Sequence, residues 1–273
     1  MEPGSVLARK GSLCVRLARS ASEIVLAQEL RYRVFYEELS AKPDAAAIAT
    51  RRDTDKFDAI CDHLIAVDSG EAAADGLRVE DGVMVGTYRL LRQSVAEAHG
   101  GFYTASEFDI GPMLAAHPKL NFLELGRSCV LKPYRTKPAV EMLWQGIWNY
   151  VRGYGVDVMF GCASLEGADP RRHEGTLAFL AGNFAPPPEW SVRALPSLRV
   201  NMRNPSVAVD IKQAMRELPP LIKGYLRLGC YIGDGAVIDR QFDTVDVLIV
   251  LPVSNIDKRY FAHFGQPDEV LNG

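Results

Sequence analysis

Two charged side chains, Glu124 and Arg127, interrupt a stretch of sequence that is otherwise apolar. Residues 122–131 have the length and the β-compatible composition of a strand. An unpaired charge buried in such a strand would be costly, so both residues require a partner or a function. Residues three apart point to opposite faces of a regular strand, but a bulge at Gly126 would bring both side chains to one face. The sequence therefore predicts a bulged strand that presents a carboxylate and a guanidinium together.

Three cations, Lys132, Arg135 and Lys137, lie in the turn that follows this strand. A helix is predicted to begin after them at Pro138, where the missing N–H of proline costs nothing. Its apolar residues recur with the period of one buried helical face: Val140, Leu143, Trp144, Ile147, Trp148 and Val151. Because a helix N-terminus carries partial positive charge, this turn is predicted to bind a phosphate group. The alternative is an ordinary strand–helix connection with a solvated basic turn.

An earlier helix carries a second pair of candidate side chains. Ser20 or Ser22 can cap this helix, which is predicted to run to about residue 39. Arg31 and Phe35 are i, i+4 neighbours on it, beside the predicted inner face. Taken alone, this pair is an arginine stem packed over an aromatic ring.

Three acids, Asp53, Asp55 and Asp58, follow within six residues. Such a group is most often a solvated loop, so a binding role needs independent support.

Further strands surround these candidates. Segments with apolar, β-compatible composition are residues 13–17, 61–67, 83–91 and 156–163. The two middle segments should form a meander, in which Arg89 shares a face with Val85 and Thr87. His63 lies in the first strand of this meander and is more often a hydrogen-bonded structural histidine than a base.

Composition limits the function classes. The chain has 273 residues, of which 48% are hydrophobic and 24% are charged, as in a soluble globular protein. A net charge of −3 argues against general nucleic-acid binding. The five cysteines are widely spaced and form no CxxC pair or His/Cys cluster, which predicts no metal site and a reducing compartment. No apolar signal segment opens the sequence, and no apolar run is long enough to span a bilayer.

The bulged strand beside a phosphate-binding turn resembles the GNAT acyltransferase superfamily, although its usual glycine-rich loop is absent. Four motifs also occur in the order and spacing of the acyl-homoserine-lactone synthases, which are GNAT-like enzymes. They are Arg31-x-x-x-Phe35, Asp53-x-Asp55-x-x-Asp58, Gly86-x-x-Arg89 and Glu124-x-x-Arg127. The chain extends further than those enzymes do. Its C-terminal segments, LPPLIKGYLRLGCYIGDGA and TVDVLIVLP, are instead similar to the ornithine-acyl-ACP N-acyltransferases of bacterial ornithine-lipid synthesis.

This second resemblance covers nearly the whole chain and carries a fold expectation. It implies an α/β fold of the GNAT type, with a mixed, mostly antiparallel twisted sheet, a bulged and splayed central strand, and flanking helices. It also implies one domain over residues 1–273, with the strand–turn–helix unit in residues 1–165 and a family-specific half in residues 166–273.

The reaction implied is transfer of a 3-hydroxyacyl chain from acyl carrier protein to the α-amine of L-ornithine, which gives lyso-ornithine lipid. Aminolysis of a thioester needs a neutral amine, a polarised carbonyl and a protonated leaving thiolate. Glu124 is the candidate base, because burial would raise its pKa, and the alternative is that Glu124 only neutralises Arg127. Tyr225 resembles the GNAT tyrosine that protonates the thiolate, but it is equally a candidate core aromatic. The candidate catalytic residues are Glu124, Tyr225 and Arg127.

The other implied roles concern binding. The three aspartates would bind the second ammonium of a diamino acid. Arg31 or Arg89 would bind its carboxylate. The candidate acceptor-binding residues are Arg31, Phe35, Asp53, Asp55, Asp58 and Arg89. A backbone N–H at Cys129 or Val130 would bind the thioester oxygen. The candidate residues for the acyl carrier and its phosphopantetheine are Cys129, Val130, Lys132, Arg135 and Lys137.

The resemblance implies no tightly bound cofactor and no metal. Phosphopantetheine enters as part of the co-substrate, and acyl carrier protein and L-ornithine are the expected partners. The expected location is the cytoplasm, with room for peripheral contact with the inner membrane. Two other classes remain open: an acyl-homoserine-lactone synthase that uses S-adenosylmethionine, and a haemolysin-like membrane-active protein. The only amphipathic candidate for the latter, residues 211–228, is interrupted by Pro219 and Pro220.

Overall fold

The computed structural model describes residues 1–70, 76–204, 206 and 209–257. These residues form one sheet of 12 strands, and its main path is β1-β2-β3-β5-β7-β8-β12-β11-β9-β6. The strands are β1 Val6–Lys10, β2 Leu13–Leu17, β3 Asp62–Asp68, β4 Leu77–Val79, β5 Gly82–Arg92, β6 Phe108–Asp109, β7 Phe122–Val130, β8 Val158–Glu166, β9 Arg193–Ala194, β10 Arg199–Val200, β11 Tyr231–Asp239 and β12 Thr244–Pro252. Among the described pairs, only β7–β8 and β9–β11 are parallel, so the predicted mixed, mostly antiparallel sheet is confirmed.

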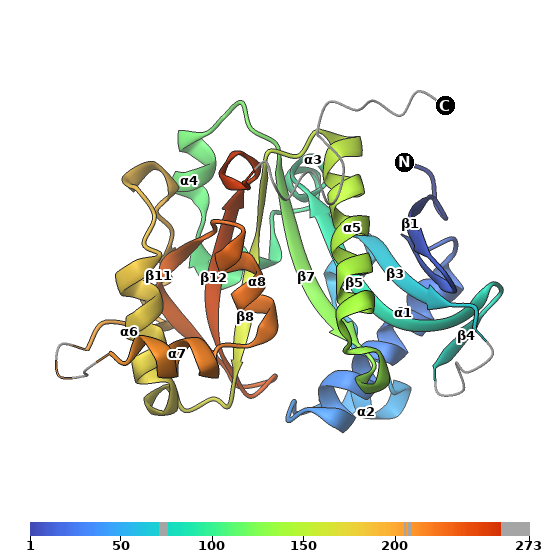
Figure 1. Cartoon of the computed structure of the whole chain (residues 1–273), viewed down its shortest axis with the longest axis horizontal. Coiled ribbons are helices and arrows are strands. Elements are labelled where there is room, and N and C mark those ends of the chain that lie inside the picture. The colour runs from blue at the N-terminus through green and yellow to red at the C-terminus, as the bar shows by residue number, and fades with distance from the viewer. Residues whose placement is uncertain (71–75, 205, 207–208, 258–273) are drawn as a thin grey trace.

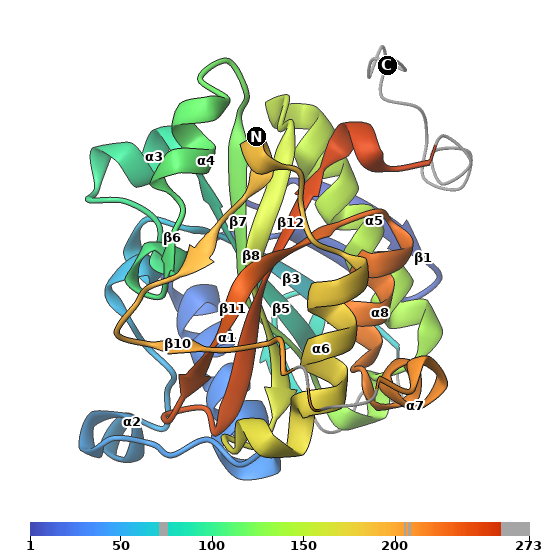
Figure 2. The same ribbon diagram turned by 90° about the vertical axis from the view of Figure 1, so that its left-hand side faces the viewer.

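Helices cover both faces of this sheet. They are α1 Ala21–Tyr32, α2 Ala45–Thr50, α3 Gln93–Ala98, α4 Gly111–Ala116, α5 Lys137–Tyr154, α6 Glu174–Asn183, α7 Ile211–Glu217 and α8 Pro220–Arg227. Figures 1 and 2 show α5, α6 and α8 on one side of the sheet, with α1, α3 and α4 on the other. No described helix combines the length and the apolar character that crossing a membrane requires.

Local sequence signals account for the elements nearest the candidate residues. Ser20 caps α1 by accepting a hydrogen bond from the backbone N–H of Glu23, and the helix continues as a π-helical segment over Arg33–Glu38. Gly155 ends α5 with a left-handed conformation, which glycine adopts readily. The predicted meander is confirmed, since β3 and β5 pair along their lengths in antiparallel register.

The central strands separate along their length. β7 pairs with β8 only from Phe122 to Glu124, and Figure 1 shows the two strands together at one end and apart at the other. Gly161 permits their close approach, because a Cβ there would lie 2.2 Å from the carbonyl oxygen of Leu125. Beyond that point β8 follows β12, with which it pairs over nine residues. The predicted splayed central strand is therefore confirmed.

The bulge in β7 lies one residue beyond the predicted position. Gly126 pairs in register with Arg89, and the register of β5 and β7 shifts between Thr87 and Arg89. Arg127 carries the positive φ of 51° that marks the irregularity. The predicted position at Gly126 is therefore wrong by one residue, and the ion pairs of Arg127 with Asp53 and Asp55 stabilise this uncommon backbone conformation.

Both halves of the chain contribute to the same sheet. Strands β1 to β8 come from residues 6–166, and β9 to β12 continue the sheet beyond β8. Two apolar layers result. One contains α5, α6 and α8 packed on the sheet, and the other gathers the aromatic residues Phe102, Phe108, Phe122 and Phe160.

Candidate active site

A cavity of about 280 Å³ lies where β7 and β8 separate. Adjacent residues of a strand point to opposite faces, yet both Glu124 and Leu125 line this cavity, because the gap between the strands opens the sheet. On one side its lining is polar, with Arg89, Glu124, Arg127, Cys162 and Asp246. On the other side it is mainly apolar, with Tyr88, Leu125, Ala163, Ile222, Tyr225 and Ile249. Two reactants of different polarity can therefore meet across the sheet.

Glu124 is buried at the polar side of this cavity. Its two carboxylate oxygens accept hydrogen bonds from the backbone N–H groups of Tyr103, at 2.9 Å, and Thr104, at 2.7 Å. Burial raises the pKa of Glu124 above its usual value, and the hydrogen bonds from Thr104 and Tyr103 offset only part of that rise. The geometry thus holds a carboxylate of raised proton affinity against the cavity. The short segment Tyr103–Ser106 that supplies both donors was not singled out from the sequence.

Arg127 does not pair with Glu124. Its Nε and Nη2 lie 3.2 Å and 3.3 Å from carboxylate oxygens of Asp53 and Asp55. The alternative in which Glu124 only neutralises Arg127 is therefore wrong, since the arginine already has two carboxylate partners. The guanidinium also lies between the rings of Tyr103 and Phe242, with its central carbon 5.0 Å and 4.7 Å from their centroids.

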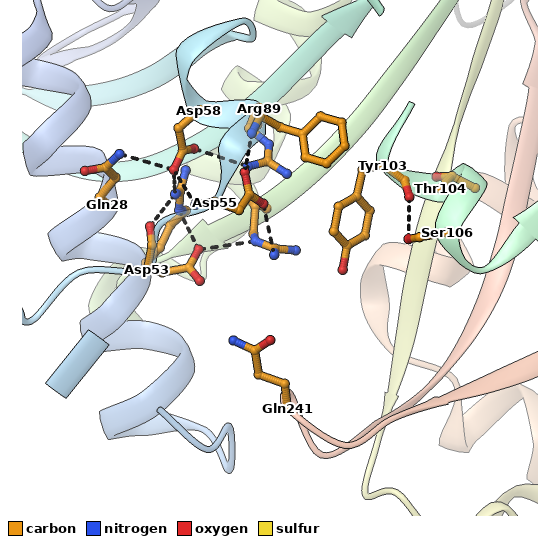
Figure 3. A network of polar contacts seen from close by, with 12 residues as sticks. Gln28, Asp53, Asp55, Asp58, Arg89, Tyr103, Thr104, Ser106 and Gln241 are labelled. Carbon is orange, nitrogen blue, oxygen red and sulfur yellow. Dashed lines mark hydrogen bonds and ion pairs between the residues drawn. The ribbon is translucent and has the colours of Figure 1, made fainter. Parts of the chain in front are cut away.

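The three aspartates and three arginines form a closed ring of alternating charges. Asp53 joins Arg31 to Arg127, Asp55 joins Arg127 to Arg89, and Asp58 joins Arg89 back to Arg31. Figure 3 shows the aspartates and Arg89 converging in this network, with Tyr103 on its cavity side. Each carboxylate is thus shared by two guanidinium groups, and the ring as a whole is neutral.

Burial decides which members of the ring reach the cavity. Arg31 is only 1% exposed, and Asp53 and Asp58 are 3% and 6% exposed, so a solvated acidic loop is wrong for these two. Burial alone would raise the pKa of Asp58, but the hydrogen bond and charge of Arg31, together with Arg89, lower it to about 2. Only Arg89 and Arg127 of the ring line the cavity, so the ring presents positive charge to it.

The remaining acceptor candidate, Phe35, also lines the cavity. Its ring packs edge-on against Phe242, with the centroids 5.4 Å apart. His63 lies outside the cavity and shares a hydrogen bond with the carbonyl oxygen of Asp58. Burial lowers the pKa of His63, which keeps it neutral near pH 7 and supports its structural interpretation.

Tyr225 lies on the apolar side of the cavity, on α8. Its hydroxyl is 3.2 Å from that of Tyr88, and its ring meets Trp144 edge-on. Burial raises the pKa of Tyr225 well above its usual value, so the phenol is neutral and holds a proton. Tyr225 is therefore a buried aromatic residue that also lines the cavity, which is compatible with both interpretations drawn from the sequence.

The turn after β7 combines buried and exposed groups. The side chain of Cys129 is buried, and burial raises the pKa of its thiol. Lys132 is exposed, whereas Arg135 binds the carbonyl oxygen of Val130 and the carboxylate of Glu38. The side chain of Lys137 lies outside the described residues.

Backbone geometry distinguishes the two candidate N–H donors in this turn. The N–H of Leu131 donates to the carbonyl oxygen of Val85 at 2.9 Å. Because N–H groups alternate in direction along an antiparallel ladder, that of Cys129 also faces β5. The N–H of Val130 faces the opposite way, toward the gap between β7 and β8. Of the two candidates, only Val130 therefore directs its donor to the gap.

A third group of side chains was missed from the sequence. Asp239 and Asp246 line the cavity, and Glu107 accepts a hydrogen bond from the cavity residue Cys162 at 3.2 Å. Burial, and then the nearby charge of Asp246, raise the pKa of Glu107 to about 7. Burial likewise raises the pKa of Asp246 to about 6. The signal for Asp246 was available, since it is a single acid inside the apolar strand β12, as Glu124 is in β7.

Across the described residues, no group of three or more His, Cys, Asp and Glu side chains has the arrangement of a metal site.

Comparisons with known proteins agree with this geometry. Residues 30–145 match the family described as Acetyltransferase (GNAT) domain. The L-ornithine N(alpha)-acyltransferase of Rhizobium meliloti is 52% identical over 261 residues, which cover 95% of this chain and 86% of that relative. The protein of the same name from Agrobacterium fabrum is 49% identical over 266 residues, which cover 97% of this chain and 89% of that one.

A solved structure, FeeM, an N-acyl amino acid synthase from uncultured soil microbes, has a TM-score of 0.48 and 11% identity. It covers 89% of this chain and 91% of its own. The GNAT match and the curated relatives lead to one conclusion: this chain belongs to the L-ornithine N(alpha)-acyltransferase family and carries a GNAT acyltransferase fold.

Proposed function

We propose that this chain transfers a 3-hydroxyacyl group from acyl carrier protein to the α-amine of L-ornithine, forming lyso-ornithine lipid. The observation that carries this proposal is the cavity through the β7–β8 gap, with a buried carboxylate on its polar side and an apolar opposite side. The relatives that share about half of the residues over nearly the whole chain are named for this acceptor. An amino acid would occupy the polar side, and the acyl thioester the apolar side.

Glu124 removes the proton that the α-amine must lose. The neutral amine nitrogen then attacks the thioester carbon, a C–N bond forms, and the C–S bond breaks. A carboxylate whose pKa is raised by burial suits this task, because its proton affinity approaches that needed near neutral pH. The two backbone N–H groups that bind Glu124 hold it in place, and the charge of Arg89 acts on it without a direct ion pair among the described residues.

Two groups serve the thioester. The N–H of Val130 faces the gap and donates to the carbonyl oxygen as negative charge develops there. The hydroxyl of Tyr225 gives its proton to the leaving thiolate, and Tyr88 keeps that hydroxyl oriented. The proton that the nitrogen loses as the amide forms then restores the phenol of Tyr225, whose raised pKa favours its neutral form. Arg89 or Arg127 takes the carboxylate of the amino acid, since these are the ring arginines that line the cavity.

A direct assay tests this function. Purified protein is incubated with 3-hydroxyacyl-ACP and each amino acid, and products are identified by mass spectrometry. We expect an acyl-ornithine. A lactone formed only with S-adenosylmethionine would instead establish the signalling class, and no transfer to ornithine would refute the proposal.

The donor is predicted to be recognised through its carrier protein. Lys132 places exposed positive charge at the turn after β7, where Arg135 is already paired with Glu38. Because acyl carrier protein is acidic, acyl-ACP should react much faster than the matching acyl-CoA. The rate with acyl-ACP should also fall as salt screens this attraction. Stopped-time assays with both donors over a salt series measure these effects.

Charge reversal makes the donor prediction specific. Lys132→Glu should raise the KM for acyl-ACP while leaving that for ornithine unchanged. Lys119→Glu is a matched control, because this exposed lysine lies just before β7, at the opposite end of the strand. Equal efficiency with the two donors, or equal effects of the two reversals, would contradict carrier recognition at this turn.

The product places a constraint on where the enzyme acts. An acyl-ornithine is amphiphilic, and its donor is a carrier of fatty-acid synthesis. Action in the cytoplasm, with transient contact at the inner membrane surface, follows from this proposal. Sedimentation of the protein with anionic lipid vesicles, with and without product, measures that contact.

A further inference from the structure

The β12 side of the cavity contains a buried carboxylate with one oxygen that lacks a hydrogen-bond partner within the described residues. Asp246 is 6% exposed, it lines the cavity, and its Oδ1 has no hydrogen-bond partner within the described part of the chain. The hydroxyl of Thr244, two residues earlier on β12 and also lining the cavity, lies beside this carboxylate. Burial raises the pKa of Asp246 by more than the hydrogen bonds from the side chains of Thr244 and Ser164 lower it. A buried charge left in this state is costly, so a ligand that completes it would bind favourably.

Other acids increase the negative charge on this side. Asp239, at the end of β11, lines the cavity, and Glu107 interacts electrostatically with Asp246. Within the described residues, no ion pair joins Glu107, Asp239 or Asp246 to a cation. Arg127, the cation that acts on both Glu107 and Asp246, is held by Asp53 and Asp55.

The other border of the gap, formed by β5 and β7, carries positive charge. The sheet order is β5, β7, β8, β12 and β11, so Arg89 and Arg127 lie on one side of the gap, and Asp246 and Asp239 lie on the other. The aspartates of the ring are unsuitable for binding a substrate ammonium, because each is already shared by two arginines. Asp246 and Asp239, by contrast, form no ion pair within the described residues, although the charge of Arg127 acts on Asp246 from a distance.

We infer that Asp246, with the Thr244 hydroxyl beside it, binds the side-chain ammonium of the acceptor amino acid. This inference rests on the proposed function and adds to it the residues that select a diamino acid. The acceptor then spans the cavity, with its carboxylate toward Arg89 and Arg127, its α-amine at Glu124 and its second ammonium at Asp246. A matching acceptor without the second amine leaves Asp246 uncompensated.

L-Norvaline tests this assignment, because it has the carbon skeleton of L-ornithine but lacks the terminal amine. Wild-type protein should prefer ornithine over norvaline in kcat/KM by roughly ten- to hundredfold, the range for one lost charge-assisted contact. Asp246→Asn should reduce this preference toward unity by lowering the value for ornithine alone. Thr244→Val should reduce it less, because it removes a hydroxyl and keeps the charge.

The melting temperature distinguishes a binding role of Asp246 from a purely structural role. Asp246→Asn removes an uncompensated buried charge, so the Tm of the free protein should stay constant or rise, while the Tm increase caused by ornithine is lost. Asp234→Asn is the control, since this exposed aspartate on β11 pairs with Arg199. Its ornithine preference should match wild type.

The outcomes separate the inference from the proposed function. An unchanged ornithine-to-norvaline ratio in Asp246→Asn, or no preference in wild type, would overturn the inference while acyl-ornithine formation still supported the function. If wild type acylated neither amine, the proposed function would fail. The inference would then stand or fall on whether ornithine raises the Tm of wild type but not of Asp246→Asn.

Discussion

Glu124→Gln is expected to lower kcat by about 10²–10⁴-fold, the usual contribution of a positioned base. The substitution keeps the shape of the side chain and removes its ability to accept a proton. One of the two backbone N–H groups at Tyr103 and Thr104 would then face the amide NH₂ rather than an oxygen. Loss of a buried charge offsets part of that cost, so the protein should remain folded.

The pH dependence identifies the proton acceptor. Burial raises the pKa of Glu124, so the wild-type rate should fall on the acid side as this carboxylate becomes protonated. The variant should lose that limb and recover activity at high pH, where more of the ornithine α-amine is neutral. A pH–rate profile beside a thermal melt measures both effects.

Glu97→Gln is the matched control for this experiment, since this carboxylate lies on α3 and accepts a hydrogen bond from Gln93 at the surface. Its kcat and its pH profile should equal those of wild type. A folded Glu124→Gln protein with near-normal kcat would exclude the base role and direct attention to Asp246, the other buried cavity acid of raised pKa.

The strands near the site were predictable because their signals are local. Residues 13–17 form β2 as expected, and β3, β5 and β7 begin and end within one residue of the predicted bounds. The helix after Lys132 was equally clear from its 3.6-residue periodicity.

The partners of those charges were not predictable from local pattern. Asp53 to Asp58 resemble a solvated loop until α1, β5 and β7 bring three arginines around them, and these elements are far apart in the sequence. The contacts of Arg127 with Tyr103 and Phe242 likewise depend on the tertiary fold.

The charge ring gives the second large expected effect, on stability. Asp58→Asn leaves Arg31 and Arg89 each with one fewer carboxylate, and Arg31 is almost fully buried. Breaking a buried pair in this way costs about 3–5 kcal/mol, which should lower the Tm by on the order of 10 °C. Asp55→Asn should cost less, because the Asp55 side chain is 21% exposed and its charge is partly solvated.

The same ring should make the protein sensitive to acid. The pKa of Asp58 is lowered from 3.8 to about 2, so its stabilisation is complete above pH 3.8 and is lost as pH falls toward 2. That difference corresponds to roughly 2 kcal/mol of unfolding free energy, which Asp58→Asn should no longer lose over this window. Urea unfolding of both proteins between pH 2 and pH 5 measures it.

Kinetic measurements distinguish a charge ring that only positions Arg89 and Arg127 from one that binds the acceptor amino acid directly. If the ring only holds Arg89 and Arg127 toward the cavity, Asp58→Asn should change the KM values for ornithine and norvaline by similar factors. If Asp58 instead bound the side-chain ammonium, its loss would raise the KM for ornithine alone. The control Asp234→Asn should cost no more than about 1 kcal/mol, as is usual for an exposed ion pair. A Tm for Asp58→Asn equal to that of this control would show that the ring contributes little to stability.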